Sequence, residues 1–420
     1  MAVCTIQNPI FELLHKRTSA KEKGVYSCCS ANAFVIRAAL RRAKANDTVV
    51  LVEATANQVN QNGGYTGMTP ADFRAFLDRL AKEEGMPAHR VLCGGDHLGP
   101  LTWQNLPEDA AMANAEELIR GYVLAGFSKI HIDTSMRVAT DDPTARLPDS
   151  VIARRGAQLC AAAEGAFAEY QILHPDAPKP VYVIGSEVPI PGGAQENEDS
   201  VTVTTPEDCE QTLAEFQSAF AARGLTDAWQ RVVAIVVQPG VEFADESVIE
   251  YDRAAAASLM ATLTRHPGLV FEGHSTDYQP RECLRQMVED GIAILKVGPA
   301  LTFALREGLF ALEQIEREQC EQIQRLQRQA QKEPDLKPVD NLLVLRAIEY
   351  LQAHYAERIG LAQTAQALYI SPNYLSELFR KTTGMRFTEY LLQLRLDKSR
   401  AYLCDVRYRV SDVTQMVGFQ

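Results

Sequence analysis

The sequence contains no long hydrophobic run, because no segment approaches the roughly 20 consecutive apolar residues that a membrane helix needs. The first residues, MAVCTIQNPIFELLHKRTSAKEKG, lack the basic start, apolar stretch and small-residue cleavage site of a signal peptide. The nine cysteines show no metal-type spacing, and Cys28 and Cys29 are adjacent, which favours reduced thiols over a disulfide framework. We therefore expect a cytoplasmic protein without a membrane segment.

The sequence also lacks a nucleotide-binding loop of the form GxxxxGK(S/T), so nothing in it supports a kinase. The net charge of −12 argues against a protein devoted entirely to nucleic acid. This charge is uneven, because residues 339–420 hold ten Lys or Arg against eight Asp or Glu, a net of +2. The 420 residues leave room for a large domain of about 250–300 residues and a smaller one.

Up to about residue 310, short runs rich in β-branched residues alternate with amphipathic helical patterns. The runs occupy residues 25–30, 49–55, 91–97, 129–135, 181–188, 232–238, 269–275 and 294–299. Such hydrophobic strands alternating with helices indicate a parallel sheet covered by helices. Eight units of this kind favour a closed (β/α)8 TIM barrel, which we place at residues 1–318.

Nearly every run ends in polar residues, namely Ser30, Glu53, Asn57, Asp96, His97, Asp133, Ser135, Glu187, Gln238, His274, Ser275 and Lys296. The carboxyl ends of barrel strands converge on one mouth, where (β/α)8 enzymes place their chemistry. On their own, Asp96 and His97 could be a helix cap beside a core histidine. Buried acids without partners would cost several kcal/mol each, so a shared functional site explains these residues better.

The loops after the seventh and eighth strands, backed by a helix N-terminus, commonly form a phosphate site in such a barrel. The candidates for binding phosphate or substrate are Asn57, Gly240, Ser275, Lys296, Gly298 and Ala300. Lys296 could pair with the phosphate or could only neutralise Glu272, and the sequence leaves both open. The Gly-rich segment NQNGGYTG suits a lid or an interface better than a nucleotide cradle.

From about residue 314 the chain becomes rich in Glu, Gln, Arg and Lys, which predicts a solvated helix and linker over residues 319–338. This helix could also pair with a second copy, and we expect an oligomer. Residues 339–420 predict a small all-α domain with a helix-turn-helix, in which Ser371 and Pro372 begin the second helix. The exposed residues of that helix, expected to contact DNA, are Asn373, Tyr374, Ser376, Glu377, Arg380 and Lys381.

The motifs GGDHLGP, AGFSKIHIDTSM, IGSEVPIPGG and VVAIVVQPGVEF closely resemble the GatZ/KbaZ family over residues 15–318. That family is the non-catalytic subunit of D-tagatose-1,6-bisphosphate aldolase and looks like a relative of the class II aldolases. The resemblance implies a proton-transferring role for Asp96, a place near the metal for Glu187, and metal ligation by His97 and His274. A third histidine is missing, because Gln238 and Pro239 stand in its place. We therefore expect a weakly held divalent ion, zinc or similar, a sugar-phosphate ligand and a catalytic partner subunit.

Residues 340–420 closely resemble the AraC/XylS family of bacterial transcription regulators through ISPNYLSELFRKTTGMRFTEYLLQLRLDKSRAYL and RVSDVTQMVGFQ. The second recognition helix of that family is absent from the sequence. Two functions from different classes therefore remain. The favoured one is a subunit that supports the aldolase, and the rival is a transcription regulator that uses the barrel as a sugar-phosphate sensor. A metal-dependent sugar 4-epimerase is a lesser alternative.

Overall fold

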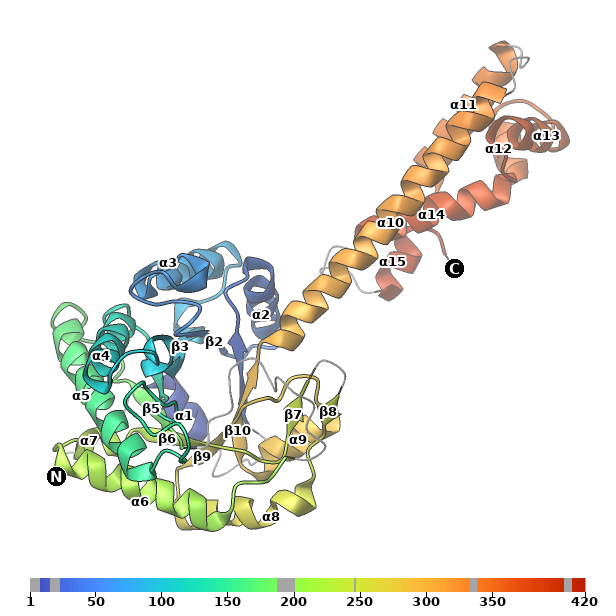
Figure 1. The fold of residues 1–420 in the computed structure, drawn as a ribbon. Helices are drawn as coiled ribbons and strands as arrows, with labels where there is room; N and C mark the ends of the chain where they lie inside the picture. Colours follow the sequence, from blue (N-terminus) through green and yellow to red (C-terminus); the bar gives the residue numbers. More distant parts are fainter. Residues whose placement is uncertain are drawn as a thin grey trace. The chain divides into compact units, whose positions relative to one another are not determined.

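The computed structural model describes residues 8–15, 23–186, 201–244, 247–332, 338–403 and 410–419. The chain divides into two compact units, residues 1–307 and 308–420. The first unit is a closed barrel of parallel strands in the order β1-β10-β9-β6-β5-β4-β3-β2 (Figure 1). The strands are β1 Val25–Cys29, β2 Val50–Thr55, β3 Val91–Leu98, β4 Lys129–Ile132, β5 Val181–Ile184, β6 Val232–Val237, β9 Val270–Gly273 and β10 Ile292–Val297. The predicted (β/α)8 fold is confirmed.

Helices cover the outside of this barrel (Figure 1). They are α2 Ala33–Ala45, α3 Pro70–Glu83, α4 Glu108–Leu124, α5 Asp149–Leu173, α6 Pro206–Ala222, α7 Thr226–Trp229, α8 Arg253–Ala261 and α9 Arg281–Asp290. The helix α10, Pro299–Lys332, begins after β10 and continues into the second unit. Short 3-10 turns lie at Gly64–Thr66, Ala88–Arg90, Pro100–Trp103 and Thr262–Arg265. A short antiparallel pair is formed by β7 Glu242–Phe243 and β8 Val248–Ile249. Side-chain hydrogen bonds fix the start of α3, because Thr69 and Asp72 form a reciprocal capping box and Pro70 takes the first helical position.

The amino-terminal end of the barrel is closed by α1, Pro9–His15. Its residues Ile10 and Leu14 pack with inward residues near the starts of the strands, among them Val25, Leu51 and Leu92. Asn8 anchors this helix, because its side-chain amide donates to the carbonyls of Ser128 and Lys179 at 2.9 and 2.8 Å. Apolar side chains therefore fill this end of the barrel. The polar residues at the carboxyl ends of the strands lie at the opposite end.

The second unit consists of helices, and it includes α11 Pro338–His354, α12 Leu361–Ala367, α13 Pro372–Thr383, α14 Phe387–Leu403 and α15 Val410–Met416. Its core combines residues of α11 to α14, such as Leu351, Ala365, Leu375 and Phe379. Ser371 caps α13 by accepting a hydrogen bond from the Tyr374 amide, and Pro372 takes the first helical position, as the sequence predicts. In the part of the chain that the structure describes, no helix is both long and apolar enough to cross a membrane.

Candidate functional site

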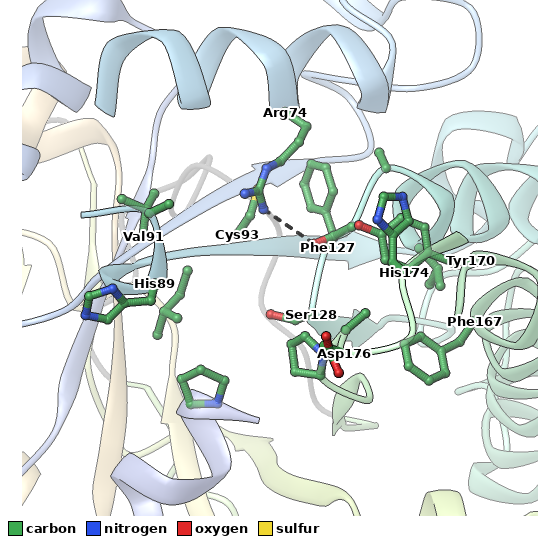
Figure 2. A pocket seen from close by; sticks show the side chains of 18 of the residues that line it. Arg74, His89, Val91, Cys93, Phe127, Ser128, Phe167, Tyr170, His174 and Asp176 are labelled. Atoms are coloured by element: carbon green, nitrogen blue, oxygen red, sulfur yellow. Dashed lines mark hydrogen bonds between the residues drawn. The ribbon is translucent and has the colours of Figure 1, made fainter. Parts of the chain in front are cut away.

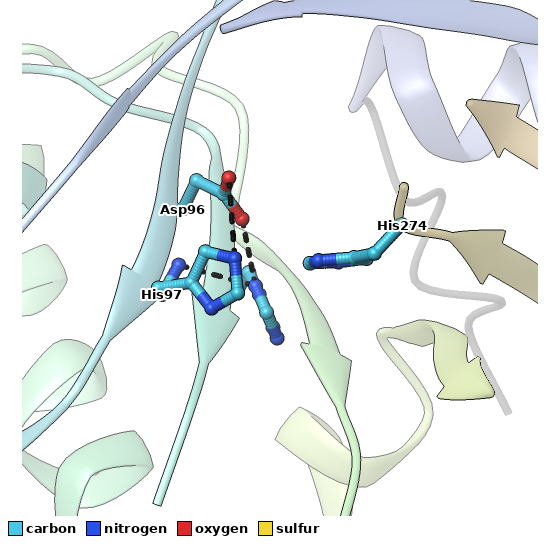
Figure 3. Close-up of side chains that lie close together, drawn as sticks. Asp96, His97 and His274 are labelled. Carbon is cyan, nitrogen blue, oxygen red and sulfur yellow. Dashed lines mark hydrogen bonds and ion pairs between the residues drawn. The ribbon is translucent and has the colours of Figure 1, made fainter. Parts of the chain in front are cut away.

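Three histidines and an aspartate meet at the carboxyl ends of the barrel strands. Asp96 and His97 end β3, His131 lies on β4, and His274 follows β9. Each offers one ligand atom, and these four atoms lie within 4.8 Å of one another. All four side chains are buried, and Figure 3 shows Asp96, His97 and His274 converging from two sides of the barrel. The structure thus brings together Asp96, His97 and His274 from the predicted set and adds His131.

His97 is oriented by a carboxylate behind it. Its Nδ1 lies 2.9 Å from Asp133 Oδ2, while Asp133 Oδ1 accepts bonds from the Ser135 hydroxyl and amide at 2.6 and 3.1 Å. An Nδ1–H donated to Asp133 leaves His97 Nε2 as the available ligand, which is the usual arrangement behind a metal-binding histidine. His97 also has a φ of +47°, a value that non-glycine residues rarely adopt. Strained backbone conformations of this kind often occur at functional sites.

His131 is the histidine that the sequence analysis missed. Its Nδ1 lies 2.8 Å from Asp96 Oδ1 and 3.1 Å from the His97 backbone nitrogen, and an Nδ1–H donated to Asp96 leaves the ring lone pair on Nε2. Its Nε2 is buried and has no hydrogen-bond partner among the described residues. A buried ring nitrogen without a partner is costly, and a metal ion would satisfy it. After the sixth strand, where Gln238 stands in place of a histidine, this residue shapes its own loop by accepting from the Gly240 and Val241 amides at 2.9 and 3.0 Å.

A buried network of charges lies beneath the histidines. Lys129 Nζ lies 2.6 Å from Glu53 Oε1 and 2.7 Å from Glu272 Oε2. Lys296 Nζ lies 2.8 Å from Asp96 Oδ1, is paired with Glu53, and lies 3.7 Å from Glu272 Oε1. Lys296 is thus engaged by carboxylates, which is the neutralising alternative that the sequence left open. Charges taken out of water in this way need close partners, and each of these has at least two.

This network fixes the charge at the site. Burial alone would raise the pKa of Asp96, but Lys296, His97 and His131 hold it well below its usual range. Burial lowers the pKa of His274 to about 3, so this imidazole is neutral at physiological pH. A carboxylate and a neutral imidazole are forms that bind a divalent cation. Burial would also lower the pKa of His97, but Asp96 and Asp133 raise it above its usual value, so a metal ion at this ring competes with a proton.

A cavity of about 570 Å³ opens above the histidines. Among its lining residues are the predicted Asn57, Ser275, Lys296 and Gly298, together with Tyr65, Phe303 and Arg306. Ala300 and Gly240 are not part of its lining, and Glu187 lies outside the described residues. The predicted phosphate donors at α10 are already in use, because Asp277 Oδ1 accepts from the Gly298 and Ala300 amides at 3.0 and 2.7 Å.

A second cavity of about 620 Å³ lies beside the amino-terminal half of β3, between α3 and α5 (Figure 2). Arg74, His89, Tyr170, His174 and Asp176 line it. The groups of possible metal ligands found among the described residues all lie at the other end of the barrel. Since (β/α)8 enzymes place their chemistry at the carboxyl ends of the strands, the histidine cavity is the candidate site.

The second unit carries its predicted functional residues on the surface of α13. Asn373, Tyr374, Ser376, Glu377, Arg380 and Lys381 are all exposed. Leu375, Leu378 and Phe379 of the same helix are buried in the core of the unit. The helix therefore presents a polar face of the kind that a recognition helix offers to DNA.

The fold and the site together define a (β/α)8 barrel with a buried Asp/His cluster that can hold a metal ion. The model of the D-tagatose-1,6-bisphosphate aldolase subunit GatZ/KbaZ-like family matches residues 10–365, and a helix-turn-helix domain model matches residues 364–420. The chain belongs to the GatZ/KbaZ-like family and carries a helix-turn-helix domain, which confirms both resemblances seen in the sequence.

Several solved structures are similar to this chain. A protein described as a probable tagatose 6 phosphate kinase from Sinorhizobium meliloti 1021 is 39% identical, with 94% of this chain and 91% of that chain covered and a TM-score of 0.63. The fructose-bisphosphate aldolase of Campylobacter jejuni matches at 14% identity over 72% of this chain and 79% of its own, with a TM-score of 0.46. The C-terminal domain of AraT, a response regulator from Geobacillus stearothermophilus, is 28% identical over 20% of this chain and 68% of its own, with a TM-score of 0.19.

Proposed function

We propose that this chain is the barrel subunit of a class II D-tagatose-1,6-bisphosphate aldolase system in carbohydrate metabolism. We further propose that it holds a divalent cation, zinc or a similar ion, at His97, His131 and His274 beside Asp96. The observation that carries this proposal is the meeting of three buried histidines at the mouth of a barrel of the GatZ/KbaZ-like family.

The residues present fit a divalent ion on several counts. The ligand atoms lie close together, His131 Nε2 lacks another partner among the described residues, and Asp133 orients His97 from behind. Three nitrogen ligands with a carboxylate nearby match the ligand types of catalytic zinc sites. Because His131 supplies the third histidine, the binding is tighter than the two-histidine set from the sequence would give. A bound ion would supply Lewis-acid polarisation of a sugar carbonyl or hydroxyl oxygen.

Asp96 is the residue placed to move a proton. Its Oδ1 is held by Lys296 and by His131, both at 2.8 Å. Its Oδ2 lies 3.7 Å from Cys29 Sγ and 3.8 Å from His97 Nε2, so this oxygen faces the ligand cluster. Asp96 also lines the cavity, within reach of a sugar bound there. The low pKa of Asp96 keeps the carboxylate ionised, which is the form that a general base needs.

Metal analysis of the purified full chain tests the proposed ligands. One divalent ion per chain is expected, and His131→Ala should weaken zinc affinity at least tenfold in a competition titration with a chelating dye. His89→Ala is the matched control, because His89 is exposed and lines the second cavity. Unchanged zinc affinity in His131→Ala would remove this residue from the site.

The role in the aldolase system is tested by mixing the chain with a catalytic aldolase subunit and measuring cleavage of D-tagatose 1,6-bisphosphate. We expect little cleavage by the chain alone and higher activity or stability of the mixture. Robust cleavage by the chain alone would contradict the supporting role. A sugar 4-epimerase activity that Asp96→Asn abolishes would favour the epimerase alternative.

The exposed face of α13 favours a second candidate function. We propose that the helical unit binds DNA through Arg380, Lys381 and their neighbours on that face. In this alternative the barrel is the sugar-phosphate sensor of a transcription regulator. A reporter assay decides between the two, since the regulator requires DNA binding that responds to a sugar phosphate added to the full chain.

A further inference from the structure

One face of α10 forms a wall of the histidine cavity. The helix contributes Pro299, Thr302, Phe303 and Arg306 to the lining of the cavity. These positions follow the spacing i, i+3, i+4 and i+7, so they share one side of the helix. Because each residue adds 1.5 Å to a helix, Arg306 lies about 10 Å further along the axis than Pro299. The wall therefore begins just after β10 and ends, about two turns later, in a cation.

Three aromatic rings lie beside that cation. Phe243, Tyr278 and Phe303 all line the cavity. The centroid of the Tyr278 ring lies 5.4 Å from that of Phe243 and 6.2 Å from that of Phe303, and both pairs pack edge to face. The Arg306 guanidinium lies over the Phe303 ring, 5.8 Å from its centroid. Since the face of an aromatic ring attracts a cation, this contact keeps the guanidinium at the cavity wall.

The two basic side chains of the lining differ in their surroundings. Lys296 is buried and paired with Glu53 and Asp96, so an anion that bound to it would have to compete with buried ion pairs. Asp277 is also buried, and its Oδ1 accepts the first amides of α10. Arg306 is exposed, so a ligand can reach its guanidinium from solvent. An anionic ligand that enters the cavity along α10 therefore meets the charge of Arg306.

A guanidinium in this position suits a phosphate group. Its planar N–H donors match phosphate oxygens, often through two parallel hydrogen bonds, and it remains protonated throughout the physiological pH range. The aromatic rings beside it offer an apolar surface to the carbon chain of a ligand. The histidines and Asp96, which lie deeper in the same cavity, suit hydroxyl and carbonyl oxygens. The cavity thus matches a ligand with a phosphate at one end and oxygen-bearing carbons at the other.

We infer that Arg306 is a specificity-determining residue, which binds the phosphate of a sugar phosphate whose oxygens face the histidines. The sequence predicts phosphate binding at Gly298 and Ala300, whereas Arg306 was not among the predicted residues. The inference rests on the proposed function for the sugar part of the ligand. Phosphate binding at Arg306 is argued from the α10 wall alone.

Titrations of the full chain with D-tagatose 6-phosphate and with D-tagatose test this inference. Isothermal calorimetry should show that the wild type prefers the phosphorylated sugar. Arg306→Gln removes the charge, so it should weaken binding of D-tagatose 6-phosphate by about tenfold or more, as the loss of a charged hydrogen bond does. It should change the affinity for D-tagatose by less than about twofold. Arg306→Lys restores the charge without the paired donors and should recover part of the loss.

Arg317→Gln is the matched control. Arg317 is an exposed arginine of the same helix that pairs with Glu313 and does not line the cavity, so its replacement should leave both affinities unchanged. An equal loss of affinity for both sugars in Arg306→Gln would indicate a general structural role for this arginine. Unchanged affinity for the sugar phosphate would show that Arg306 does not bind the phosphate. Either result would overturn the inference.

Inorganic phosphate separates the inference from the proposed function. A 31P NMR titration of the wild type should show saturable binding that Arg306→Gln weakens by about tenfold or more and Arg317→Gln leaves unchanged. Equal phosphate binding in the wild type and in Arg306→Gln would overturn the inference even if the sugars bind. If the expected difference is found but neither sugar binds, the proposed function fails, whereas the phosphate-binding role of Arg306 is supported.

Discussion

The barrel and the helical unit that follows it bury different kinds of side chains. Within the described residues, the barrel buries Glu53, Asp96, Lys129, Glu272 and Lys296 at or near its mouth. Among the residues of the helical unit whose burial the structure describes, the buried polar ones are Thr364 and Thr383, neither of which carries a charge. The chemistry of the barrel is therefore inside it, whereas any function of the helical unit must use its surface.

This difference has an energetic reason. Moving a charge out of water costs several kcal/mol, and close pairing repays that cost only in part. A fold retains such groups where they serve a site, because apolar replacements of the same volume would pack as well or better. The charges buried together at the mouth of the barrel therefore support the proposed site, whereas the apolar core of the helical unit supports only its fold.

Replacing Lys129 should have the largest effect. Lys129→Met leaves Glu272 and Glu53 buried with one cation fewer, so we expect a loss of about 3–5 kcal/mol in the free energy of unfolding. Trp103 and Trp229 both belong to the barrel, so urea unfolding followed by tryptophan fluorescence reports on this unit. Lys381→Met, an exposed lysine on α13, is the control and should change stability by at most about 0.5 kcal/mol. A loss below 1 kcal/mol in Lys129→Met would show that the buried carboxylates do not need this partner.

Asp133→Asn tests whether the carboxylate behind His97 supports a metal site. Because Asp133 fixes the orientation of His97, its loss should lower zinc affinity by about 10–100-fold. The matched control is Asp142→Asn, since Asp142 is exposed and bonds to its chain neighbour Thr144. Equal zinc affinity in both variants would mean that His97 does not bind the ion.

The same aspartate should give the barrel a measurable pH dependence. Burial would raise the pKa of Asp133, but the bond from His97 and the charges nearby lower it from 3.8 to about 2. A lowered pKa stabilises the fold above the unfolded-state value and loses this effect as the pH falls toward 2. The contribution is about 2 kcal/mol at pH 7, with about half of it lost at pH 3. Metal-free urea unfolding of wild type and Asp133→Asn at both pH values should therefore show a difference that narrows on acidification.

The strand pattern of the barrel could be predicted because each strand is a short hydrophobic run, and the eight runs all became barrel strands. The strand ends were less accurate, since the runs 129–135 and 181–188 extend beyond β4 Lys129–Ile132 and β5 Val181–Ile184. The pair β7 and β8 was not predicted, because two residues per strand leave no periodic pattern. Nor was the plug formed by α1, whose seven residues are too few to show a helical face.

The site was only partly predictable for a related reason. The ends of the hydrophobic runs predict the site residues, whereas His131 and Lys129 lie inside the fourth run and were not predicted. The alternation of side chains along the strand would have predicted them, because Lys129, His131 and Asp133 share one face of the strand and that face points into the barrel. Asp277 gave no such signal, since the amides that it caps lie more than twenty residues further along the chain.

The smallest expected effect lies on the surface of the helical unit. Arg380 and Lys381 are exposed on α13, and the unit carries a net charge of only +2 over residues 339–420. One such module contacts few phosphates, so we expect salt-sensitive binding of the full chain to DNA with Kd of roughly 10⁻⁴–10⁻⁶ M at physiological salt.

Arg380→Ala and Lys381→Ala should each weaken binding several-fold and reduce the salt slope by about 1, as a lost phosphate contact does. Arg317→Ala, an exposed arginine of α10, is the control and should leave both quantities unchanged. Gel shifts at two salt concentrations measure both quantities. Nanomolar, sequence-specific binding would show that one module suffices, and it would move the function of the chain toward transcription regulation.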